Sequence, residues 1–170
     1  RFDWLSKIAG EVIATPGCES NVKEIFDKTW ELRRTRKDVV IFNQFEEMGN
    51  VLWHYQVTGK AIADAYESLK TDTTRFAGAC FTSGSAGTMS AGDYLKEQYP
   101  HAKLAVGEAL QCPTLLENGF GGHRIEGIGD KHVPWVHNVK NTDMVIDIDD
   151  EDSQNLSLIH ISEPTRLGMI

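Results

Sequence analysis

The side chains best suited to do chemistry surround a run of small residues, Ser83-Gly-Ser-Ala-Gly-Thr88. The run follows an apolar stretch that predicts a buried strand, Phe76–Thr82, and it leads into a predicted helix, Met89–Tyr99. Because no large side chain intervenes, its backbone N–H groups can approach a ligand closely, beside the positive end of the helix dipole. The hydroxyls of its two serines and its threonine add donors. The pattern predicts an anion site, most often one for the phosphate of a small molecule.

The same run excludes two common phosphate motifs and leaves another chemistry open. It has no Lys of the G-x-x-x-x-G-K-[ST] type and no G-x-G-x-x-G spacing. It is close to the G-x-S-x-G nucleophile elbow, with Ser83 in the place of the first glycine and Ser85 as the nucleophile. Asp130 with His132 or His137 would supply the acid and base in the required chain order. A serine acyl-hydrolase is therefore the alternative hypothesis, and a tight turn without a ligand is the simplest one.

Strands and helices are expected to alternate along the chain, which predicts an α/β fold with a mainly parallel sheet and helices on both faces. In such sheets ligands lie at the carboxyl ends of strands, where the small-residue run is expected. The Gly49–Gly59 segment is expected to be mostly loop. Ser20 or Asn21 is expected to cap the second helix. The expected strands are Glu11–Thr15, Val39–Phe42, Phe76–Thr82, Lys103–Gly107 and Asp143–Ile148, and the expected helices are Phe2–Ala9, Val22–Arg34, Lys60–Lys70 and Met89–Tyr99.

Composition excludes several classes of function. The net charge of −8 argues against a nucleic-acid surface, and 41% hydrophobic residues is ordinary for a soluble protein. No apolar run approaches the ~20 residues that span a bilayer. The three cysteines are widely spaced, which favours a reducing cytoplasm over disulfides or a metal centre. His132 and His137 lack a third ligand at a convincing spacing, so no metal site is expected.

Three segments in fixed order carry a family resemblance. They are Asn43-Gln-Phe45 with Asn50, His54-Tyr55 and Thr58-Gly59; then Gly84-Ser-Ala-Gly-Thr88; then Glu126-Gly-Ile-Gly129 with Pro134. They resemble the Q-F-x-N-x-x-N-x-x-x-H-x-x-T-T-G stretch, the G-T-G-G-T phosphate cup and the E-G-I-G-x-x-x-x-P segment of one family. That family is the fold-type II pyridoxal-phosphate enzymes of the cysteine synthase and cystathionine β-synthase group. The likeness extends from about residue 7 to residue 152.

The resemblance implies a tryptophan-synthase-β-like fold and pyridoxal 5'-phosphate as cofactor. Gly84, Ser85, Ala86, Gly87 and Thr88 would bind the cofactor's phosphate. Gly127 would lie by the cofactor ring and Gln44 near the substrate's carboxylate. The family eliminates or replaces a group at the β-carbon of a small amino acid, with the pyridine ring as the electron sink. A homodimeric parent protein in the cytoplasm is expected, with no nucleic-acid or membrane partner.

Departures from the family's pattern bear on the mechanism. Ala86 replaces a glycine, which suggests either that this position needs no positive φ or that the cup is altered. Glu46-Glu-Met-Gly49 replaces a neutral, Pro-rich stretch, which suggests a different substrate. None of the ten lysines matches the motif of the family's Schiff-base lysine. We therefore expect an internal fragment that does not turn over by itself, and a non-catalytic relative is a further hypothesis.

The expected domain organisation follows from the same comparison. Residues 1–43 would end a smaller domain, and residues 44–155 would form part of a larger cofactor-binding domain. Residues 156–170 resemble a translated sequencing adapter, so we expect a non-native, poorly packed tail.

Overall fold

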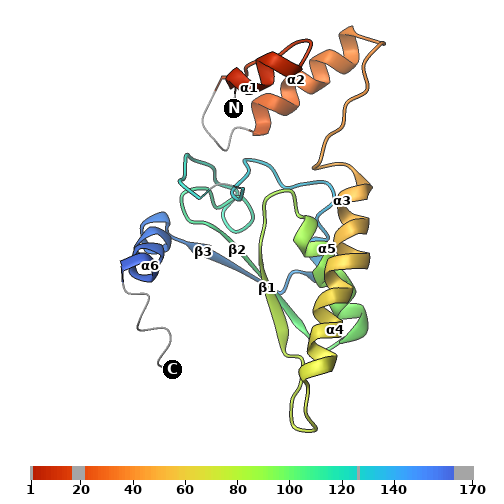
Figure 1. The fold of residues 1–170 in the computed structure, drawn as a ribbon, viewed down its shortest axis with the longest axis vertical. Helices are drawn as coiled ribbons and strands as arrows, with labels where there is room; N and C mark the ends of the chain where they lie inside the picture. The colour runs from red at the N-terminus through yellow and green to blue at the C-terminus, as the bar shows by residue number, and fades with distance from the viewer. Residues whose placement is uncertain (1, 17–21, 126, 163–170) are drawn as a thin grey trace.

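The computed structural model describes residues 2–16, 22–125 and 127–162. Within them, three parallel strands form one sheet in the order β1-β2-β3 (Figure 1). The strands are β1 (Gly78–Thr82), β2 (Lys103–Ala109) and β3 (Met144–Ile148). They lie where apolar runs predicted strands, and the predicted parallel α/β sheet is confirmed.

A helix directly after the small-residue loop covers one face of the sheet. This helix is α5 (Gly87–Gln98), and it contacts β1 and β2. Its Met89 joins a buried cluster with Ala86 and Val106. Gly92 lets the sheet come close, since a Cβ there would stand 2.5 Å from Leu104 Cδ1. The Gly92–Leu104 contact and the cluster around Met89 hold α5 against β2.

A long helix packs on α5 (Figure 1). It consists of α3 (Met48–Trp53), a π-helical stretch (His54–Gly59) and α4 (Lys60–Leu69). The expectation of a loop at 49–59 is therefore wrong. Gly59 is buried there because the two helices meet closely, with its missing Cβ 2.7 Å from Tyr94 Cβ. Packing against α5 outweighs the low helix propensity of the glycines.

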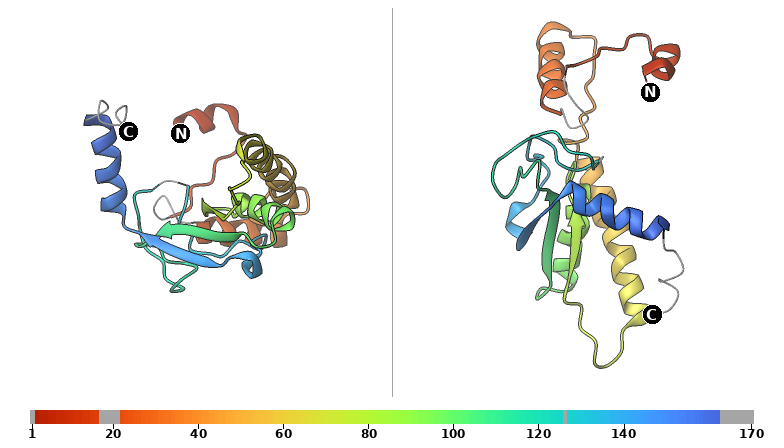
Figure 2. Two further views of the ribbon diagram at one scale, coloured as in Figure 1. Left: turned by 90° about the horizontal axis from the view of Figure 1, so that it is seen from below. Right: turned by 90° about the vertical axis from the view of Figure 1, so that its left-hand side faces the viewer.

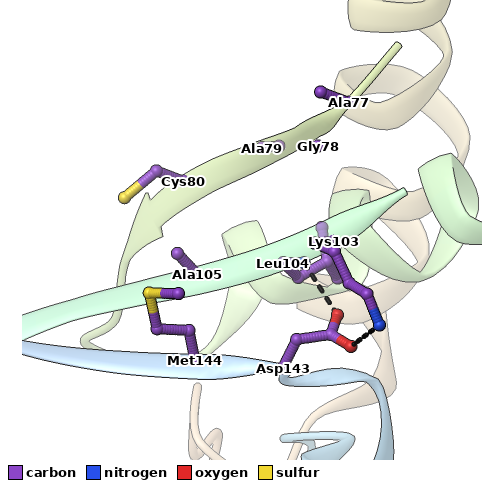
Figure 3. Close-up of a pocket in the computed structure, with 9 residues that line it drawn as sticks. All are labelled: Ala77, Gly78, Ala79, Cys80, Lys103, Leu104, Ala105, Asp143 and Met144. Carbon is purple, nitrogen blue, oxygen red and sulfur yellow. Dashed lines mark hydrogen bonds and ion pairs between the residues drawn. The ribbon is translucent and has the colours of Figure 1, made fainter. Parts of the chain in front are cut away.

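The opposite face of the sheet is apolar and open. Cys80, Ala105 and Met144 are register partners and line a shallow hollow of about 630 Å³ along the strands (Figure 3). Ile146 and Ile148 on β3 are also exposed. Parallel sheets are normally covered on both faces. The prediction of helices on both faces is therefore met on one face only within residues 2–16, 22–125 and 127–162, whose helices leave this second face exposed.

The N-terminal helices lie apart from the sheet (Figures 1 and 2). They are α1 (Phe2–Ile8) and α2 (Val22–Thr35), and neither contains a buried residue. The strands expected at 11–15 and 39–42 are wrong, because neither segment pairs with another strand in the described part of the chain. Phe42 is 87% exposed. The expected caps Ser20 and Asn21 fall outside the described residues.

The chain leaves the sheet through one more helix. After a short 3-10 turn (Val139–Asn141) and β3 comes α6 (Asp150–Ser162), whose first turn is acidic. Leu156, where the unusual tail begins, is 59% exposed. The tail beyond residue 162 lies outside the described residues.

Candidate phosphate-binding site

The small-residue loop lies at the carboxyl edge of the sheet, between β1 and α5 (Figure 1). Its first residue continues the sheet, because the Ser83 N–H donates to the Gly107 carbonyl at 3.3 Å. The Thr88 hydroxyl donates back to the Thr82 carbonyl at 3.0 Å. These two bonds close the turn from both sides. The Thr88 hydroxyl is thus engaged within the fold, and its backbone N–H is the group it offers to a ligand.

The turn depends on an unusual backbone conformation at Ala86. This residue caps α5 in the left-handed region, with φ 63° and ψ 11°. The suggestion that Ala86 needs no positive φ is therefore wrong. An L-residue pays roughly 1–2 kcal/mol for this conformation, and here the methyl group is 1% exposed against Met89 and Val106. A left-handed residue next to right-handed ones directs successive N–H groups into one concavity, which favours an anion.

The backbone donors of this loop are unused. No described residue accepts a hydrogen bond from the backbone N–H of Gly84, Ser85, Ala86, Gly87 or Thr88. Ala86 and Gly87 are buried, and Gly84 and Ser85 are partly buried. Buried N–H groups without a partner are costly and rare. The loop therefore presents a set of donors at a helix N-terminus that an anion would satisfy.

The segment before α3 and α3 itself each supply a side chain to the loop. The Gln44 Nε2 group donates to Ser85 Oγ at 2.8 Å. The Asn50 Nδ2 group donates to the same Oγ at 3.2 Å and lies 3.5 Å from the Ser85 carbonyl. Gly87 leaves room for this approach, since a Cβ there would stand 2.5 Å from Asn50 Oδ1 and 2.9 Å from His54 Nε2. Asn50 was part of a recognised motif, but nothing in its spacing indicated that it would contact Ser85.

The Gly-rich segment from the third motif closes the other side. A Cβ on Gly84 would stand 2.2 Å from the Gly127 carbonyl oxygen, so the two backbones touch. Gly127 and Gly129 both have positive φ, at 84° and 73°. The Gly129 carbonyl accepts a hydrogen bond from Cys112 Sγ at 3.1 Å and also lies 3.1 Å from His123 Nε2. Glu126 of the same motif lies outside the described residues.

A buried carboxyl group, that of Asp130, stands beside the loop. Asp130 lines a small cavity of about 10 Å³ together with Ser83, Gly84 and His132. Burial raises the pKa of Asp130 to about 6, and the charge of His123 opposes that shift. Burial also raises the pKa of Glu108 in the same cavity wall, against the two backbone N–H groups of Leu115 and Leu116 that bind it. The sequence suggests Asp130 only as the acid of the acyl-hydrolase hypothesis.

The geometry does not support the acyl-hydrolase hypothesis. A serine nucleophile needs a base that accepts its proton. In the described part of the chain, Ser85 Oγ contacts two amide donors and no imidazole. His137 pairs instead with Thr142 at 2.9 Å, and His132 packs edge-on against Phe26.

The described residues form neither a cluster suited to a metal ion nor a membrane-spanning helix. Among them, no group of three His, Cys, Asp or Glu side chains is arranged to hold a metal ion. None of their helices combines the length and apolar character needed to cross a membrane.

Comparison with known proteins points to one family. No family model matches the chain. It is 30% identical over 154 residues to a probable cysteine synthase of Bacillus subtilis, covering 90% of this chain and 48% of the relative. It is 28% identical over 158 residues to the cysteine synthase of Staphylococcus aureus, covering 92% and 49%. The chain thus spans about half the length of the curated relatives it matches.

Solved structures agree with the sequence relatives. A hydrogen sulfide-producing enzyme of Fusobacterium nucleatum is 28% identical, with a TM-score of 0.72, and the match covers 89% of this chain and 45% of that one. An O-acetylserine-dependent cystathionine beta-synthase of Helicobacter pylori shares the fold at 24% identity and a TM-score of 0.69, covering 90% and 48%. By sequence and by fold, the chain is a homologue of the cysteine synthases over about half of their length.

Proposed function

We propose that this chain forms the phosphate-binding part of a pyridoxal-phosphate enzyme that eliminates or replaces a group at the β-carbon of a small amino acid. The observation that carries the proposal is the unused donor set of Gly84–Thr88 at the N-terminus of α5. Gln44 and Asn50 contact this loop from one side and Gly127 from the other. The three motifs that resemble the family therefore meet at one place in the fold.

The residues present fit a phosphate group. The donors come from the backbone, and the two glycines at 84 and 87 carry no Cβ where neighbouring atoms stand within 2.2 and 2.5 Å. Partly buried N–H groups at a helix N-terminus match a phosphate dianion in charge and in hydrogen bonding. When bound, the pyridoxal group would supply the electron sink of the reaction.

Each of the chain's residues has a limited task in this proposal. The N–H groups of Gly84 to Thr88 bind and orient the phosphate. Gly127, with φ 84°, brings backbone close to the loop and leaves space for a flat ring. Gln44 Nε2 uses one N–H on Ser85 and keeps a second, which can donate to the carboxylate of a substrate. Which amino acid is used, and which group leaves, stays open.

The chain is proposed not to form the covalent lysine bond to the cofactor by itself. Six of its ten lysines are paired with carboxylates away from the loop, namely Lys23, Lys28, Lys60, Lys70, Lys96 and Lys103. Borohydride reduction of the chain with pyridoxal phosphate is expected to leave no stoichiometric adduct. A single complete adduct on one lysine would overturn this part of the proposal. The homodimeric assembly and the cytoplasmic location of the parent stay predictions from the resemblance and the composition.

The phosphate assignment is tested by comparing two ligands. The chain is titrated with pyridoxal phosphate and, separately, with pyridoxal, and the quenching of tryptophan fluorescence reports binding. The difference between the two affinities separates phosphate binding from ring binding. We expect pyridoxal phosphate to bind at least tenfold more tightly, which corresponds to about 1.4 kcal/mol. Equal affinities would refute the proposal.

A further inference from the structure

We infer that Asn50, together with Gln44, is a positioning residue that turns the hydroxyl proton of Ser85 toward the bound anion. The inference rests on the proposed function, because it concerns the phosphate site described there. Neither amide side chain needs to touch the phosphate. Each acts through the hydroxyl group that it contacts.

The inference follows from what a hydroxyl group can do. A serine Oγ has two acceptor lone pairs and one donor proton. In this structure Gln44 Nε2 donates to it at 2.8 Å and Asn50 Nδ2 donates at 3.2 Å. Both lone pairs are then occupied. The capacity left to Ser85 Oγ is donation, on the side away from the two amides.

The orientation of the Asn50 amide is set by its neighbours. Its Nδ2 group lies 3.4 Å from the Gln44 carbonyl oxygen and 3.5 Å from the Ser85 carbonyl oxygen, and carbonyls only accept. The donor end of the amide must therefore face this side. Its Oδ1 end lies against Gly87, where a Cβ would stand 2.5 Å away. The Asn50 side chain thus extends from α3 to the first turn of α5.

Within residues 84–88, Ser85 carries the hydroxyl that is left to donate to an anion, so the direction of its proton matters. The Thr88 hydroxyl already donates to the Thr82 carbonyl at 3.0 Å. Without the two amides, neither lone pair of Ser85 Oγ is engaged, and its proton is free to turn away from an incoming anion. A hydrogen bond to a charged group contributes about tenfold or more to affinity. Holding the proton in the productive direction secures that contribution before the ligand arrives.

A double-mutant cycle tests the inference. The affinities for pyridoxal phosphate and for pyridoxal are measured for the full chain, Ser85→Ala, Asn50→Ala and the double variant. We expect about tenfold weaker binding of pyridoxal phosphate in Ser85→Ala and about three- to tenfold in Asn50→Ala. The double variant should be no weaker than Ser85→Ala, and pyridoxal affinity should not change. Gln56→Ala, an exposed amide of the same long helix, is the matched control and should bind as the parent chain does.

Each outcome decides the question. Additive losses in the double variant, or an Asn50→Ala variant that binds as the parent does, would overturn the inference while the proposed function stands. If the parent chain binds both ligands equally, the proposed function fails and the inference with it. Should Asn50→Ala not fold, Asn50→Asp keeps the shape but turns a donor into an acceptor. It is then expected to weaken pyridoxal phosphate binding more than tenfold above pH 6, and unchanged binding would overturn the inference.

Discussion

The contact between Gly84 and Gly127 makes a sharp prediction about the Gly84→Ala variant. The new Cβ would stand 2.2 Å from the Gly127 carbonyl oxygen, 3.2 Å from its carbon and 3.5 Å from Asp130 Oδ2. Ordinary contact distances require the two backbones to part by about 1 Å. The atom in the way is backbone in a turn with positive φ, so it cannot rotate aside as a side chain would.

The expected cost has a structural and a functional component. Overpacking of this kind destabilises a protein by about 1–3 kcal/mol. Moving the loop by about 1 Å also disperses the N–H groups that are to meet the phosphate, and misplacement on that scale costs on the order of a hundredfold in a positioned site. Urea unfolding gives the first quantity, and titration with pyridoxal phosphate gives the second.

A second glycine of the chain supplies the control. Gly49 is exposed in α3, and nothing stands within 4 Å of its missing Cβ. Gly49→Ala is expected to raise the free energy of unfolding by roughly 0.5–1 kcal/mol, because alanine favours the helix. If Gly84→Ala were as stable as the parent and bound the ligand equally well, the close approach of the two segments would be refuted.

Three further predictions concern pH and local stability. Burial raises the Asp130 pKa to about 6, so the stabilisation from this carboxyl group is present below pH 4 and is lost as the pH rises through 6. In Asp130→Asn, the free energy of unfolding measured from pH 4 to 8 should not show that loss. Parallel pH profiles for the variant and the parent would contradict the prediction. Hydrogen bonds from Lys96, from the Leu104 N–H and from Lys103 lower the Asp143 pKa. The stabilisation from this carboxylate is therefore present above pH 4 and is lost in acid. Asp143→Asn should make the free energy of unfolding depend less on pH below pH 4. Backbone amides of α1 and α2, which contain no buried residue, should exchange hydrogen with little protection compared with those of α5, and equal protection by mass spectrometry would count against this packing.

Sequence pattern was sufficient for the elements that have partners within the chain. β1, β2 and α5 were predicted closely because their apolar residues face one another in the core. The Val39–Phe42 run has the same composition, yet it forms no strand, since no described segment lies beside it to pair. Apolar content indicates burial, but only a neighbour decides which element forms.

The site was predicted in outline and missed in its details. Small residues between a strand and a helix indicate a backbone anion site, and the loop is placed at the carboxyl edge of the sheet as expected. The left-handed Ala86 contradicts an alanine's usual preference, because its buried methyl and the turn override it. The contacts of Asn50 with Ser85 and of Gly127 with Gly84 join residues about 35 and 43 positions apart, and pairings at that separation depend on tertiary packing that no local periodicity encodes.

The amide resonances of the loop in an NMR titration of the chain with pyridoxal phosphate test the central claim most directly. Saturable shifts of the backbone N–H signals of Gly84 to Thr88, larger than those anywhere on the open face around Cys80 and Met144, are the predicted result. Inorganic phosphate should move the same signals at higher concentration, and pyridoxal should not. Loop signals that stay unmoved while the ligand binds elsewhere would contradict the account.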